Sequence, residues 1–190
     1  CQTLDEMSGM ELFFKCEHLQ KVGAFKFRGA TNAVMQLTET EARKGVVTHS
    51  SGNHAQALAL AAKTRGIPAT IIMPNNAVPA KKAAVEGYGA RVVECEPRLD
   101  AREEAAQKVL DEDGGVFIHP YNHPHIIAGQ GTVALELFEQ VSDVDVVIAP
   151  VGGGGLMSGI CIATRGVRSW TRIIAAEPEG ADDFARSMAT

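Results

Sequence analysis

The stretch DVVIAPVGGGGLMSGI, residues 145–160, decides the fold class of this chain. It predicts a buried strand over 145–149, followed by four glycines at 152–155 and an apolar helix that begins at Leu156. Backbone N–H groups of residues without side chains can converge on an anion, and the start of a helix adds partial positive charge. We therefore interpret 152–155 as a phosphate-binding loop. A flexible linker is the alternative, although polar residues normally flank linkers.

Short apolar runs alternate with helical patterns along the rest of the chain. This alternation is typical of parallel strands joined by crossover helices, so the predicted fold class is α/β. The predicted strands are 12–16, 45–48, 69–73, 91–95, 116–119, 144–149 and 172–176. The predicted helices are 27–37, 55–65, 79–88, 100–112, 129–140, 156–166 and a last one at 185–190.

Composition favours a soluble globular protein with one domain or two small lobes. The chain has 190 residues, of which 45% are hydrophobic and 22% charged, and its formal net charge is -5. The basic residues are scattered, so neither nucleic acid nor a membrane is an expected partner. No apolar run reaches the ~20 residues of a membrane-spanning helix, and no signal-peptide pattern opens the chain. We expect a cytoplasmic protein whose four cysteines are reduced and mostly buried.

Two further segments carry candidate functional residues. Ser50-Ser51-Gly52-Asn53-His54 follows a predicted strand and opens a helix, so its polar groups can contact a ligand or merely cap the helix. In Phe25-Lys26-Phe27, a lysine between aromatic rings can lose hydration, which lowers its pKa and makes its amine nucleophilic toward a carbonyl. A solvated lysine beside Arg28 is the alternative. An amine, a phosphate loop and polar ring contacts are together what pyridoxal phosphate requires.

In order and spacing, these motifs resemble the serine racemase and serine/threonine dehydratase family of fold-type II pyridoxal phosphate enzymes. The matching segments are 21–29, 50–54, 66–68, 87–90, 128–132, 152–155 and 177–179. The resemblance implies two lobes with parallel sheets flanked by helices. Residues 1–46 and 121–190 would form part of a larger cofactor-binding lobe, and 47–120 a smaller lobe. Family members also have an N-terminal arm and a large C-terminal portion, so we expect a fragment with exposed apolar surface.

The resemblance also implies roles for individual residues. Lys26 would form a Schiff base with the cofactor and act as the base on one face, with Phe25 packed near the ring. Asn53 would bind the cofactor's 3′ oxygen. The phosphate would be held by Gly152, Gly153, Gly154, Gly155 and Leu156. The substrate would be bound by Ser50, Ser51, Gly52, Asn53 and His54, with Ser51 as the acid or base on the opposite face.

Proton-handling groups on both faces are what racemisation needs. The implied activity is that of a serine racemase, an L-serine dehydratase that forms pyruvate and ammonia, or both, acting on small β-hydroxy amino acids. One alternative is a threonine or threo-3-hydroxyaspartate dehydratase; residues 120–125 resemble the latter. A second alternative is a non-catalytic fragment that binds pyridoxal phosphate. The family further implies a homodimer at full length and a nucleotide effector.

A divalent cation is also implied. Glu177, the Ala181 carbonyl and Asp183 match the family's site, and oxygen ligands of this kind suit Mg²⁺ or Ca²⁺. Without the family, two acids before a helix would be a solvated cap. We interpret the histidines at 119, 123 and 125 as part of a loop that lines the region between the lobes, Trp170 as partly buried packing and Cys161 as core.

Overall fold

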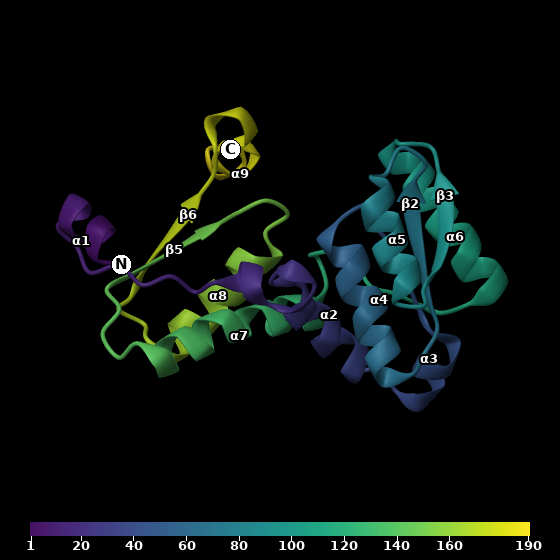
Figure 1. Ribbon diagram of the computed structural model, residues 1–190, viewed down its shortest axis with the longest axis horizontal. Coiled ribbons are helices and arrows are strands. Elements are labelled where there is room, and N and C mark those ends of the chain that lie inside the picture. Colours follow the sequence, from purple (N-terminus) through teal and green to yellow (C-terminus); the bar gives the residue numbers. More distant parts are fainter.

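The computed structural model describes residues 1–190, and its two sheets lie in two separate lobes (Figure 1). The four-stranded lobe contains a parallel sheet of order β3-β2-β1-β4. Its strands are β1 (Val46–His49), β2 (Ala69–Pro74), β3 (Arg91–Cys95) and β4 (Val116–Phe117). Its helices are α3 (Glu39–Lys44), α4 (Asn53–Arg65), α5 (Pro79–Gly87) and α6 (Leu99–Asp113). The predicted α/β class is confirmed.

Side chains of neighbouring strand residues point to opposite faces, and this divides the core of the four-stranded lobe. Val46 and Ile71 pack with the alanine-rich helix α4 on one face. Val47 and Ile72 pack with α6 on the other face. Because α4 is covered on nearly all sides, its small residues are buried, including Ala55, Ala57, Ala59, Ala61 and Ala62.

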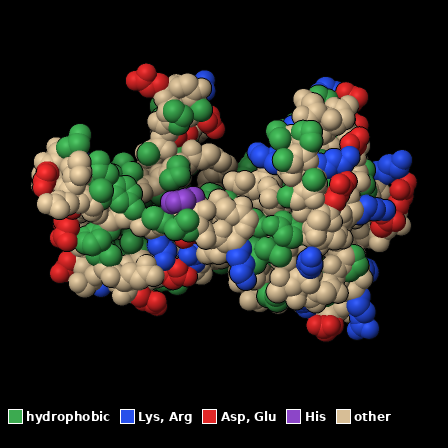
Figure 2. Space-filling view, viewed as in Figure 1, with side chains coloured by type: hydrophobic (Ala, Val, Ile, Leu, Met, Phe, Trp, Pro, Cys, Tyr) green, Lys and Arg blue, Asp and Glu red, His purple; other side chains and the backbone are tan.

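The two-stranded lobe contains the parallel strands β5 (Val146–Pro150) and β6 (Arg172–Ala176). Helices α7 (Pro124–Gln140) and α8 (Gly155–Val167) share a core with the buried face of β5. The predicted buried strand is only half buried, because Ile148 is 65% exposed on the other face. Apolar side chains are visible on this lobe in Figure 2. The remaining elements are α1 (Gln2–Ser8), η1 (Glu17–Leu19), η2 (Lys21–Gly23), η3 (Glu179–Ala181) and α9 (Asp183–Met188).

Helix α2 (Lys26–Met35) lies between the lobes (Figure 1). Its apolar residues join the core around α4. On another side α2 meets α7 at two glycines: a Cβ on Gly129 would lie 2.6 Å from the Cα of Gly29. The same helix α7 meets α8 at Gly131 and Gly159. Three helices are therefore stacked with their backbones in contact, because no side chain separates them.

Several expectations were wrong. Residues 12–16 form no strand; they pair with neither sheet and leave Phe13 and Phe14 exposed. Trp170 is 72% exposed and lies beside the Arg168 guanidinium instead of in a core. All four cysteines are free as expected, but Cys1 and Cys16 are exposed, and Cys95 and Cys161 are only partly buried. No helix is both long and apolar enough to cross a membrane.

The close contact between α7 and α8 predicts a strong effect of Gly159→Ala. The added Cβ would lie 2.4 Å from the Ile127 carbonyl oxygen and 2.5 Å from the Gly131 nitrogen, so the helices must separate. We expect a loss of about 1–3 kcal/mol in the free energy of unfolding, measured by urea denaturation. Gly166→Ala is the control in the same helix, with no atom near its Cβ, and should be neutral or stabilising by up to about 1 kcal/mol. Equal effects of the two substitutions would contradict the close contact.

Candidate functional site

Residues 118–121, which follow β4, contact all three motif segments. The Pro120 carbonyl accepts a hydrogen bond from Lys26 Nζ at 2.6 Å. The Ile118 carbonyl lies 3.2 Å from His54 Nε2, in the serine-containing segment. Tyr121 packs against the glycine loop, since a Cβ on Gly153 would lie 2.4 Å from its ring. Sequence reasoning placed the histidines at 119, 123 and 125 in a loop that lines the region between the lobes, and noted that residues 120–125 resemble one group of dehydratases, but it did not indicate that residues 118–121 contact all three motif segments.

Lys26 is the first residue of α2, and its side chain is partly buried. Its nitrogen lies 5.4 Å from the centre of the Phe25 ring. Burial disfavours the charged ammonium, which lowers the pKa of Lys26 to about 8. About a tenth of the amine is therefore uncharged at pH 7, far more than for an ordinary lysine, and the uncharged form is the one that attacks a carbonyl.

The glycine loop presents free backbone donors. The N–H groups of residues 152–157 donate to no backbone or side-chain acceptor, and the first bond of α8 runs from Ser158 to the Gly154 carbonyl. Gly154 has φ 83°, a conformation that favours glycine. Gly152 and Gly153 are exposed to solvent. Free N–H groups at the start of a 13-residue helix form a suitable cradle for a phosphate.

The glycines of this loop have different surroundings on its two sides. Nothing lies within 4 Å of a Cβ on Gly152 or Gly154, so the loop is open on that side. On the other side, Cβ atoms on Gly153 and Gly155 would collide with the ring and backbone of Tyr121. Tyr121 is thus the back wall of the cradle.

The segment 50–54 follows β1, and its last two residues begin α4. Ser50 Oγ accepts a hydrogen bond from the Gly52 N–H at 3.2 Å. The N–H groups of Ser51, Asn53 and Ala55 have no acceptor within the chain, and neither the Ser51 nor the Asn53 side chain has a partner. These groups are free to contact a ligand at the start of α4. Asn53 is exposed, whereas Ser50, Ser51 and Gly52 are half-buried.

His54 differs from its neighbours because it is fully buried. Its Nε2 faces the Ile118 carbonyl, so this nitrogen carries the proton, while Nδ1 has no partner. Burial, followed by the nearby charge of Lys26, lowers the pKa of His54 to about 3. A neutral, buried His54 is a support beneath the segment and not a solvent-exposed ligand contact.

His119 orders the connecting residues. Its Nδ1 accepts hydrogen bonds from the N–H groups of Tyr121 and Asn122, at 3.3 and 2.9 Å. Its ring lies perpendicular to that of Tyr121, with centroids 4.5 Å apart. Burial and the nearby charges of His49 and Lys26 lower the pKa of His119. The neutral imidazole can therefore keep both acceptor contacts near pH 7.

The predicted cation ligands lie at the other end of the two-stranded lobe. Both carboxylate oxygens of Glu177 accept backbone N–H groups of α9, from Phe184 at 3.0 Å and Ala185 at 2.9 Å. Asp183 opens the same helix, and Ala181 ends η3. No group of three His, Cys, Asp or Glu side chains is placed to hold a metal. Glu177 therefore acts as a helix cap here, and each of its oxygens retains a lone pair for a cation.

An amine of lowered pKa and a free N–H cradle, joined by one segment, define a site for a phosphorylated carbonyl compound. The chain belongs to the family of pyridoxal-phosphate dependent enzymes, which matches residues 1–190. It is 56% identical to a β-hydroxyaspartate dehydratase of Paracoccus denitrificans, covering 97% of this chain and 59% of the relative. It is also 56% identical to a serine racemase of Arabidopsis thaliana, covering 98% of this chain and 56% of the relative.

A solved structure of maize serine racemase superimposes with a TM-score of 0.97 at 51% identity. The match covers 99% of this chain and 57% of the maize protein. The chain thus spans somewhat more than half the length of these relatives. The shared fold includes the lobes, the connecting residues and the glycine loop described above.

The contact between Tyr121 and Gly153 predicts a non-additive pair of substitutions. Gly153→Ala should weaken pyridoxal phosphate binding at least about tenfold in an absorbance titration, because the ring must leave its place behind the loop. Tyr121→Ala removes that ring and should weaken pyridoxal phosphate binding less than Gly153→Ala does. The double variant should bind no more weakly than Tyr121→Ala alone. Additive losses would show that Tyr121 does not set the loop conformation.

Proposed function

We propose that this protein is a pyridoxal-phosphate dependent racemase and dehydratase of small β-hydroxy amino acids, with serine as the preferred substrate. The observation that carries the proposal is the Lys26 amine of lowered pKa, which is joined through Pro120 and Tyr121 to a loop of free N–H groups. Relatives of two kinds, serine racemases and a β-hydroxyaspartate dehydratase, support the same substrate class.

Within this proposal, the chain's own residues hold the cofactor at three points. Lys26 would bind its aldehyde, the N–H groups of residues 152–156 would bind its phosphate, and Asn53 would donate to its ring oxygen. Phe25 would pack near the ring. The cofactor, when bound, would supply an electron sink that acidifies the substrate's α-proton.

The remaining groups would bind the substrate and move its proton. The free N–H groups at the start of α4 suit the substrate's carboxylate. Lys26, with its lowered pKa, can accept the α-proton on one side. Ser51, whose hydroxyl has no partner within the chain, would handle the proton on the opposite side, and Ser50, Gly52 and the buried His54 would shape the segment.

A threo-3-hydroxyaspartate dehydratase is the second candidate, favoured by the Paracoccus relative. Its substrate carries a second carboxylate, which requires a cation or several donors. Among the described residues near Lys26, the histidines His49, His54 and His119 have lowered pKa values and are uncharged near pH 7. His49 and His119 can donate a ring N–H to a carboxylate, whereas the one proton of His54 is used on the Ile118 carbonyl. None of the three brings a permanent charge, and for this reason we place serine first.

Replacing Lys26 tests the proposed function directly. With pyridoxal phosphate, the unmodified chain should show a visible absorption band that shifts with L-serine, and Lys26→Ala should lose it. Lys21→Ala, which changes an exposed lysine of the same segment, is the control and should keep the band. Three measurements report the reaction itself: exchange of the serine α-proton with solvent, formation of D-serine and formation of pyruvate.

Each outcome separates the candidate functions. Faster turnover of threo-3-hydroxyaspartate or threonine than of serine would favour the dehydratase alternatives. Cofactor binding without α-proton exchange would indicate a non-catalytic binding fragment. A band that persists in Lys26→Ala would contradict the proposal.

We also propose, from the family resemblance, that the full-length protein forms a homodimer and responds to a nucleotide effector. A further proposal is that Glu177, Ala181 and Asp183 bind Mg²⁺ or Ca²⁺ in the protein. Saturating cation should raise the midpoint of thermal unfolding by a few degrees, since it binds only the folded state. Asp183→Asn should remove the shift, and Glu179→Gln, at an exposed neighbouring carboxylate, should not. An unchanged midpoint in the unmodified chain would contradict the metal site.

A further inference from the structure

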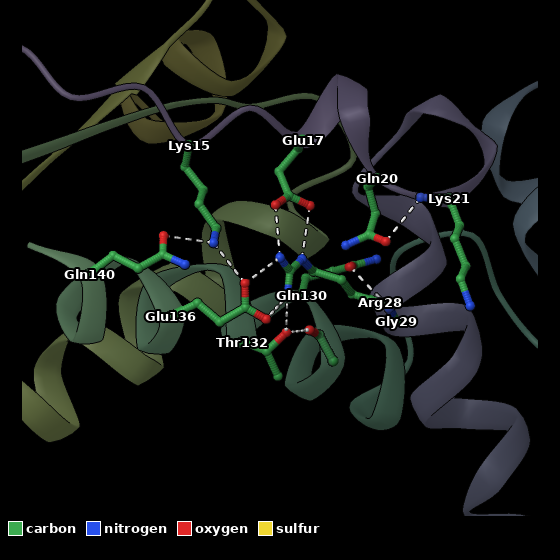
Figure 3. Close-up of polar contacts among 11 residues, drawn as sticks. Lys15, Glu17, Gln20, Lys21, Arg28, Gly29, Gln130, Thr132, Glu136 and Gln140 are labelled. Carbon is green, nitrogen blue, oxygen red and sulfur yellow. Dashed lines mark hydrogen bonds and ion pairs between the residues drawn. The ribbon is translucent and has the colours of Figure 1, made fainter.

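The guanidinium of Arg28 uses all of its N–H groups (Figure 3). Nε and Nη2 donate to the two carboxylate oxygens of Glu17, both at 2.8 Å. Nη1 and Nη2 donate to the two oxygens of Glu136, at 2.6 and 2.7 Å. Nη1 also donates to Thr132 Oγ1 at 3.1 Å. Two bidentate carboxylates around one arginine form a rigid junction that a lysine, with three donors from one nitrogen, cannot reproduce.

This junction is electrostatically balanced and well shielded. Only 9% of the Arg28 side chain is exposed. Lys15 also binds Glu136, at 2.7 Å, so two cations face two carboxylates. Hydrogen bonds from Arg28 and then Lys15 lower the pKa of Glu136 to about 2. Glu136 and Arg28 therefore stay ionised throughout the neutral range.

The three partners come from segments on both sides of Lys26. Glu17 lies in η1, before the loop that leads into α2, and Thr132 and Glu136 lie on α7. The bonds from Arg28 to Glu17 thus close the loop of residues 18–25 at its base. Those to α7 fix the first turn of α2, together with the hydrogen bond from the Gly29 N–H to the buried Gln130 side chain at 3.1 Å.

Local structure alone does not secure this end of α2. Its N-cap residue, Phe25, makes no side-chain capping hydrogen bond, and the first turn carries no acidic residue. In the preceding loop, Val22 has φ 59°, which is strained for a β-branched residue. Such a conformation persists only where surrounding contacts enforce it. The bidentate bonds between Arg28 and Glu17 hold together the two ends of this loop.

From these contacts we infer that Arg28 is a positioning residue, which holds the first turn of α2 so that the Lys26 amine stays buried against the Pro120 carbonyl. The Arg28 guanidinium hydrogen-bonds to neither the glycine loop nor residues 118–121. It acts through the backbone of α2, two residues from Lys26. The inference rests on the proposed role of Lys26 as the reactive amine.

The test measures the reactivity of Lys26 without cofactor. Trace acetylation of the chain between pH 6 and 11, read by peptide mass spectrometry, gives the midpoint at which each lysine becomes reactive. Lys26 should have a midpoint near 8 in the unmodified chain. The ionisable groups coupled to it, His54 and His119, both have lowered pKa values, so they are neutral at the pH values around the Lys26 midpoint. The exposed Lys108 is the internal reference.

Arg28→Lys keeps the positive charge but loses the planar guanidinium that binds both carboxylates in a bidentate manner. We expect the Lys26 midpoint to rise by at least about one pH unit, which lowers its labelling near pH 7.5 roughly tenfold relative to Lys108. Arg91→Lys is the matched control, because Arg91 pairs with Asp113 on the surface of the other lobe, and it should leave the midpoint unchanged. Circular dichroism establishes that each variant is folded.

A folded Arg28→Lys variant with an unchanged Lys26 midpoint would overturn the inference. Should that variant not fold, Glu17→Gln decides, because it keeps the size of the partner and removes one acceptor oxygen. The midpoint should then rise by a smaller amount, and no rise would again overturn the inference. An ordinary midpoint in the unmodified chain would instead refute the premise that Lys26 is a reactive amine, and with it the proposed function.

Discussion

Helix α2 approaches α7 so closely at Gly29 and Gly129 that no side chain fits between the two backbones. This contact fixes one side of α2, and the core around α4 fixes the other. The two ends are held by arginines from different directions: Arg28 binds α7, whereas Arg65 of α4 donates to the Val34 and Leu37 carbonyls at the end of α2. The helix is therefore shared by the lobes, and Lys26, at its start, lies where residues 118–121 pass between them.

Most of the fold was predictable from the spacing of the hydrophobic residues and from the glycines and prolines that separate helices and strands. The strands 91–95 and 172–176 were predicted at their observed bounds because a β-branched apolar run defines each of them. Residues 12–16 were predicted as a strand on the same grounds and are not one, since their apolar side chains find no neighbouring strand. Helix α7 begins at Pro124, five residues before its prediction, because proline is tolerated in the first turn of a helix.

The candidate site was predictable only in pieces. Local sequence indicated an unusual lysine and a glycine loop, since each signal is contained in a few consecutive residues. It did not indicate that Tyr121 is the reason for two of the glycines, because that contact spans more than thirty residues. Nor did it distinguish His54, which is buried, from Asn53, which is exposed one residue earlier. The roles assigned to individual residues remain predictions, and the geometry supplies their physical basis.

The central claim is that Lys26 is the residue that binds pyridoxal phosphate. Borohydride reduction of the cofactor-loaded chain, followed by peptide mapping, tests it most directly, because reduction makes the attachment permanent. The account predicts a single phosphopyridoxyl group on Lys26. Modification of another lysine in preference to Lys26, or no modification at saturating cofactor, would contradict it.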